Sequence, residues 1–89
     1  MTKLEQIIEM YPDEAFLKAD GLDDAILGAA ELKPSGIIVL VYSRSLAVKV
    51  FIDRDGMTEE EAEEYYDYNV VGAYMGEKTP IWVEDEFFD

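Results

Sequence analysis

The chain has no cysteine and no histidine among its 89 residues, and these absences narrow the chemistry open to it. Without cysteine there is no disulfide framework, no thiolate nucleophile and no sulfur-ligated zinc. Without either residue type, a serine or a metal ion lacks its usual catalytic partner. Catalysis would have to rest on carboxylates alone. We therefore predict a protein that is not an enzyme and that needs no cofactor.

Basic residues and long apolar runs are also scarce. Seven Lys and Arg stand against 21 Asp and Glu, which gives a formal net charge of −14. Phosphate binding needs clustered bases, so direct binding to nucleic acid or to an anionic membrane surface is disfavoured. No apolar stretch approaches the roughly 20 residues of a membrane span, and the first residues lack the pattern of a signal peptide. We expect a cytoplasmic protein whose partner is basic.

The residues that are present suffice for one hydrophobic core. Apolar residues make up 49% of the chain, with six Tyr, four Phe and one Trp, which is too rich for a disordered polypeptide. A chain of this size buries only about 60% of its unfolded surface, so one core is the most it can form. No repeat or linker divides the sequence. We predict a single domain over residues 1–89.

The first third of the chain indicates short helical segments. Thr2 and Glu5 have the spacing of a capping box, and apolar residues follow at helical intervals as far as Pro12. Further helical turns are expected at residues 13–18 and at 22–27, the second closed by a glycine.

The middle of the chain contains the clearest strand signal. The run from Ile37 to Val41 has no polar alternation, which is typical of a strand buried on both faces. Residues 46–52 fit either a strand or a helix. We favour the helix because Ser43 or Ser45 can cap its start and Gly56 can end it.

The strongest local signal is a second capping box, formed by Thr58 and Glu61, which predicts a helix to about Tyr74 or Met75. At 100° per residue this helix has one largely apolar face and one acidic face. The predicted fold class is α+β. Three strands near residues 29–33, 37–42 and 80–84 are covered by helices near 2–11, 44–54 and 58–75.

The acidic segment before this helix, Asp53 to Gly56, is a poor match to a calcium-binding loop. When Gly56 is aligned with the sharp turn of such a loop, Phe51 and Ala62 occupy the first and last positions, where carboxylates are required. We therefore predict no metal site there.

Three segments of the second half resemble a family of small uncharacterised bacteriophage and prophage proteins. These segments are Asp55-Gly56-Met57-Thr58, Glu61-Ala62-Glu63-Glu64-Tyr65, and the run from Tyr68 to Pro80. The resemblance covers roughly residues 36–84 and implies a phage origin and a shared fold, with no mechanism. It also implies that a corner between helix and strand is shaped by Asn69, Gly72, Gly76 and Pro80. In this corner we expect the Asn69 amide to be buried, in preference to a ligand contact.

The acidic side chains form the candidate site. We call the following set the acidic ridge: Asp53, Asp55, Glu59, Glu60, Glu63, Glu64 and Asp67. The acidic residues at 84–89 can extend it. One reading is a solvated surface that keeps a small domain soluble. The other is a phosphate-like array that occupies a basic groove on a host protein or a protein–nucleic acid complex, as a nucleic-acid mimic that inhibits a host defence protein.

The alternative from a different class is a small structural or homodimeric accessory protein. Its contact surface would involve apolar side chains near the two acidic segments, namely Val71, Tyr74, Phe87 and Phe88.

Overall fold

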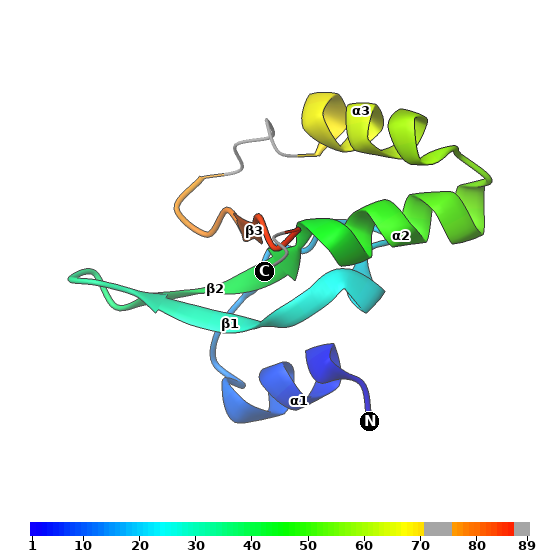
Figure 1. Cartoon of the computed structure of the whole chain (residues 1–89). Helices are drawn as coiled ribbons and strands as arrows, with labels where there is room; N and C mark the ends of the chain where they lie inside the picture. Colours follow the sequence, from blue (N-terminus) through cyan, green and yellow to red (C-terminus); the bar gives the residue numbers. More distant parts are fainter. Residues whose placement is uncertain (71–75, 87–89) are drawn as a thin grey trace.

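The structure, a computed structural model, describes residues 1–70 and 76–86 (Figure 1). Its elements in these ranges are helix α1 (Lys3–Met10), a 3₁₀ turn η1 (Asp23–Ala25), strands β1 (Ile26–Leu32) and β2 (Ile37–Ser43), helices α2 (Arg44–Asp55) and α3 (Glu59–Asn69), and strand β3 (Ile81–Val83). The predicted α+β class is confirmed.

The sheet has the strand order β1-β2-β3. β1 runs antiparallel to β2, with Ala30 opposite Val39, and β3 runs parallel to β2, with Trp82 opposite Tyr42. The continuous apolar run is thus the central strand. Its Val39 and Leu40 are completely buried, but Ile37, Ile38 and Val41 are only half-buried, so the strand is less fully buried than the sequence predicted.

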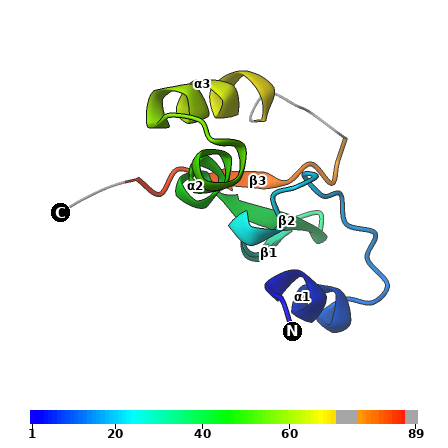
Figure 2. The ribbon, with the colours of Figure 1, turned by 90° about the vertical axis from the view of Figure 1, so that its right-hand side faces the viewer.

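The helices lie on both sides of the sheet. α1 packs against β1, and α3 lies on the opposite side of the molecule with α2 beneath it (Figures 1 and 2). α2 follows β2 without an intervening loop and contacts η1 as well as α3. The sheet and α2 therefore act together as the base on which α3 is mounted.

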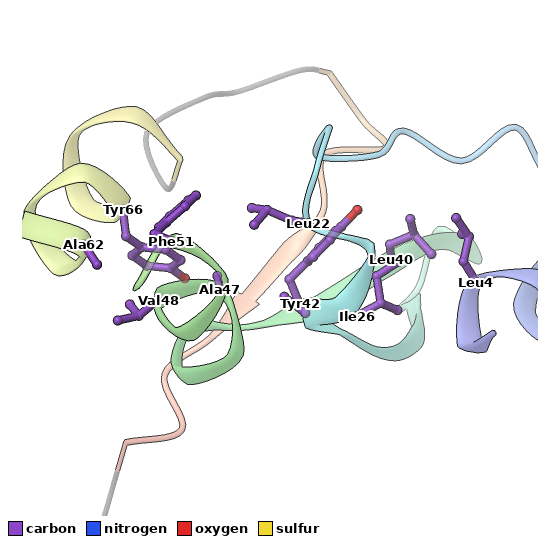
Figure 3. Packing of buried hydrophobic residues seen from close by; sticks show 11 residues of the cluster. Leu4, Leu22, Ile26, Leu40, Tyr42, Ala47, Val48, Phe51, Ala62 and Tyr66 are labelled. Carbon is purple, nitrogen blue, oxygen red and sulfur yellow. The ribbon is translucent and has the colours of Figure 1, made fainter. Parts of the chain in front are cut away.

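One hydrophobic cluster extends from α1 to α3 (Figure 3). At its centre the Tyr42 ring stacks on Trp82, with ring centroids 4.6 Å apart. The Tyr42 hydroxyl accepts a hydrogen bond of 2.9 Å from the backbone N–H of Ala19, which ties the loop after α1 to the sheet. Burial and the hydrogen bond thus fix the same side chain.

The capping residues predicted for the three helices are present in the structure. Thr2 and Thr58 each form a complete capping box. The Ser43 side chain accepts from the N–H of Leu46, and Gly56 ends α2 with a left-handed φ of 70°. Residues 46–52 lie inside α2, so the helical interpretation is confirmed and the strand is wrong.

The helical turn expected at residues 13–18 is absent, because long-range contacts hold this segment in an irregular conformation. Phe16 packs edge-on against Tyr11, and Lys78 lies over the Phe16 ring while pairing with Glu14 at 2.7 Å. Contacts from distant residues therefore override the weak local helical preference.

The helical turn predicted at residues 22–27 is shorter in the structure, and the first strand begins earlier than predicted. Only Asp23–Ala25 are helical, and β1 begins at Ile26, three residues earlier than predicted. Ile26 is buried and pairs with Tyr42, and a register shift follows before Gly28 pairs with Val41. Gly28 thus belongs to an irregular strand and does not close a helix, in keeping with the use of glycine at bulges.

Helix α3 is shorter than predicted. It ends at Asn69, where Val70 closes the last turn through its N–H to the carbonyl of Tyr66 and packs against the core. The prediction that this helix continues to residue 74 or 75 is therefore wrong, because α3 ends at Asn69. Residues 71–75 themselves lie outside the described part of the chain.

Candidate functional site

Helix α3 is built so that one face is fixed and the other remains available. Ala62 and Tyr66 are completely buried on the side facing α2. The Tyr66 ring meets Trp82 edge-on at 5.7 Å, and the Arg44 guanidinium lies 4.8 Å from its centroid. No described helix or strand lies on the side of α3 away from α2 (Figures 1 and 2).

The start of α3 is stabilised by a capping box and by the acidic residues of its first turn. The Thr58 hydroxyl accepts from the N–H of Glu61 at 3.1 Å, and the Glu61 carboxylate accepts from the N–H of Thr58 at 2.9 Å. These contacts with Thr58 lower the pKa of the Glu61 carboxyl. Glu59 and Glu60 occupy the same first turn, where the helix dipole favours negative charge.

Three ridge residues display free charge. Glu59, Glu60 and Glu64 are exposed, and none of them forms an ion pair within residues 1–70 and 76–86. Because all three belong to one anchored helix, their carboxylates are presented from a fixed backbone. We call these three residues the α3 glutamates; Asp53 of α2 is also exposed and forms no ion pair in the same ranges.

Two other ridge residues are neutralised by arginines of the same chain. Asp67 accepts hydrogen bonds of 2.9 and 3.4 Å from Arg44. Asp55 accepts two bonds of 2.9 Å from its neighbour Arg54, and this contact lowers the pKa of the Asp55 carboxyl. Two of the seven ridge acids are therefore already paired within the chain.

The remaining two ridge residues differ from the α3 glutamates in their surroundings. Glu63 is half-buried, and its carboxyl group lies close to that of Glu86. Burial, followed by this contact with a second carboxyl group, raises the pKa of Glu86. Asp53 is exposed on α2 and lines a hollow of about 420 Å³ between α2 and η1, which also contains Asp24 and Lys49.

The acidic segment after β3 is engaged with the start of α2 and does not extend a free ridge. Arg44, whose side chain is only 15% exposed, lies 3.2 Å from Glu84 and 3.8 Å from Glu86, in addition to Asp67. Arg44 is thus surrounded by three carboxylates from two distant segments. Of the tail, residues 87–89 lie outside the described part of the chain.

Asp85 is a structural residue that sequence reasoning missed. Its carboxylate accepts from the N–H and the hydroxyl of Ser45, both at 3.0 Å, and from the Ser43 hydroxyl at 2.5 Å. Burial opposes ionisation, but the hydrogen bonds outweigh it and lower the pKa of the Asp85 carboxyl. The two serines at a helix start signal a cap, whereas nothing in the local sequence indicates an acid 40 residues away.

The predicted corner is only partly within the described residues. Asn69 is exposed and donates a 3.3 Å hydrogen bond to the Tyr65 carbonyl of its own helix, so the expectation of a buried amide is wrong. Gly76 has a φ of 96° and accepts from Thr79, while Pro80 is buried immediately before β3. Gly76 does not end α3, which stops seven residues earlier. Gly72 lies outside the described residues, as do Val71, Tyr74, Phe87 and Phe88.

A shallow hollow of about 410 Å³ lies beside the α3 glutamates. We call it the tyrosine hollow, and its lining residues are Met57, Glu61, Glu64, Tyr65, Tyr68 and Asn69. Tyr65 is 43% exposed and Tyr68 is 81% exposed. At 100° per residue Tyr68 lies between Glu61 and Glu64, on the side of α3 away from the core, which agrees with its exposure.

The described residues contain no grouping of three or more acidic side chains arranged to hold a metal ion. Nor does any helix within them have the length and apolar character needed to cross a membrane.

Comparisons with protein-family models, with curated proteins and with solved structures found no match for this chain. The resemblance to small phage proteins therefore stays a prediction.

Proposed function

We propose that this chain is a non-enzymatic, phage-encoded binding protein that uses the α3 glutamates to occupy a basic, nucleic-acid-binding site on a host protein. The observation that carries the proposal is the contrast within the ridge. Some of its acids are neutralised by arginines. Glu59 at the start of α3, and Glu60 and Glu64 on the side away from its buried face, remain exposed and form no ion pair within residues 1–70 and 76–86. Acids kept free in this way favour a cationic partner.

The net charge of −14 supports the same function. A net charge of magnitude about 2 to 8 is enough to keep a small domain soluble. The excess produces a field that accelerates association with basic surfaces and weakens as salt screens it. A host protein whose basic groove normally binds phosphates, such as a defence nuclease in the host cytoplasm, has the complementary chemistry.

The first test is a competition experiment on proteins captured from bacterial lysate. The variant Glu59→Gln, Glu60→Gln, Glu64→Gln removes three charges from the α3 glutamates. A matched control, Glu9→Gln, Asp13→Asn, Glu77→Gln, removes three exposed charges elsewhere. The wild type and the control should retain a protein that the first variant does not retain, and added double-stranded DNA should displace it. Equal retention by all three forms would exclude the proposal.

A second candidate function is a homodimeric accessory protein, and one surface favours it. A groove of about 230 Å³ between α1 and β1 is lined mainly by apolar atoms of residues that include Ile7, Met10 and Leu27. β1 is also at the edge of the sheet, a position that invites pairing with another strand. Sedimentation of the pure protein decides this candidate: a concentration-independent monomer would exclude it.

A further inference from the structure

The tyrosine hollow contains two aromatic rings, one packed against the core and one exposed to solvent. The Tyr65 ring packs edge-on against the buried Phe51, with centroids 4.9 Å apart, so its position is fixed. Tyr68 is 81% exposed and makes no hydrogen bond, ion pair or ring contact with the described part of the chain. Such an exposed ring adds little to folding stability, and its apolar surface stays in water in the free protein.

Two carboxylates line the tyrosine hollow, and no Lys or Arg is among its lining residues in the described part of the chain. Glu61 and Glu64 line the same hollow, and Glu64 has no ion pair within residues 1–70 and 76–86. The nearby Arg54 is committed to Asp55 and to the Gly21 carbonyl, at 2.9 and 2.6 Å. The hollow therefore combines aromatic faces with a carboxylate that lacks a counter-ion.

This combination selects among cations. A guanidinium is planar and weakly hydrated, stacks on an aromatic face, and forms paired hydrogen bonds with a carboxylate. An ammonium group is a strongly hydrated point charge that cannot stack or bond in this paired manner.

We propose that the tyrosine hollow binds an arginine side chain of the basic partner, stacked against Tyr68 and paired with Glu64. The inference rests on the proposed function, because it names the side chain by which that partner is recognised. The α3 glutamates then attract any basic surface, and the hollow distinguishes surfaces rich in arginine from surfaces rich in lysine.

The test compares two synthetic peptides of equal length and charge, oligo-arginine and oligo-lysine, in titrations at low salt. The wild type should bind oligo-arginine more tightly, and Tyr68→Leu should reduce that preference about threefold, the size of one exposed cation–π contact. Tyr68→Phe keeps the ring and should keep the preference. Thermal unfolding of the variants should match the wild type, because Tyr68 is exposed.

The outcomes separate this inference from the proposed function. If both peptides bind with equal affinity, or if Tyr68→Leu retains the full arginine preference, the arginine site is excluded while the acidic surface stands. If neither peptide binds at low salt, the acidic surface and the arginine site both fall.

Discussion

At the scale of single residues, Asp85 connects the end of the described chain to the start of α2. It accepts three hydrogen bonds from Ser43 and Ser45. We predict that Asp85→Ala lowers the free energy of unfolding by about 1 to 2 kcal/mol, since the helix loses an acidic cap. Urea denaturation measures this, and Asp85→Asn, which keeps one acceptor oxygen, should lose less. Equal stability of Asp85→Ala and wild type would contradict the assigned role.

The same carboxylate gives a pH dependence with a definite sign. Because hydrogen bonds lower its pKa in the folded state, its stabilising contribution is complete above the unfolded pKa of about 3.9 and is lost as the pH falls through the folded value. The stability difference between the wild type and Asp85→Asn should therefore shrink below about pH 4. Denaturation curves of both proteins from neutral to acidic pH test this, and a constant difference would contradict it.

At Tyr66, removal of a polar group should stabilise the protein. Its side chain is completely buried, and its hydroxyl has no hydrogen-bond partner within residues 1–70 and 76–86. Burial raises the pKa of this hydroxyl to about 12. Removing an unpaired buried hydroxyl while keeping the ring should raise the free energy of unfolding, by about 1 kcal/mol in Tyr66→Phe. Thermal and urea unfolding provide the measurement, and a loss of stability would show that the hydroxyl is satisfied.

At the scale of elements, α3 depends on its first turn. Thr58→Ala removes the hydroxyl that accepts from the N–H of Glu61 and keeps the backbone N–H that donates to the Glu61 carboxylate, so it should lower the free energy of unfolding by about 1 kcal/mol. Thr58→Ser retains the hydroxyl and should be close to the wild type. The effect is measured by urea denaturation with circular dichroism. If alanine and serine behave alike, the capping box does not stabilise the helix.

Elements whose signals are local were predictable from the sequence. The caps at Thr2, Ser43 and Thr58 and the apolar run of β2 identified α1, α2, α3 and the central strand. Errors arose where distant residues decide the conformation. The loop containing Phe16 follows its contacts with Tyr11 and Lys78, and the start of β1 follows its pairing with β2.

The candidate site was predictable in composition but not in pairing. Helical spacing places Glu60, Glu63, Glu64 and Asp67 on one side of α3. It cannot show that Arg44 reaches Asp67 across 23 residues or Glu84 across 40. Those contacts depend on how β3 returns beside β2. The sequence therefore overestimated the free ridge, and the structure reduces its unpaired part on α3 to three glutamates.

At the scale of the whole molecule, some carboxylates are paired with arginines of the same chain and others are exposed to solvent. Arg44 holds carboxylates from α3 and from the segment after β3 together, so part of the acidity stabilises the fold. The α3 glutamates have no such partner in the described residues. We propose that these three side chains, on an anchored helix, form the surface that binds a basic partner.

The most direct test measures the affinity for a lysine-rich peptide as a function of salt in three proteins. These are the wild type, the variant with Glu59, Glu60 and Glu64 changed to glutamine, and the control with Glu9, Asp13 and Glu77 changed to Gln, Asn and Gln. We expect the first variant alone to lose most of its affinity and most of its salt dependence. Equal losses in the variant and the control would mean that total charge, and not this surface, determines binding, which would contradict the account.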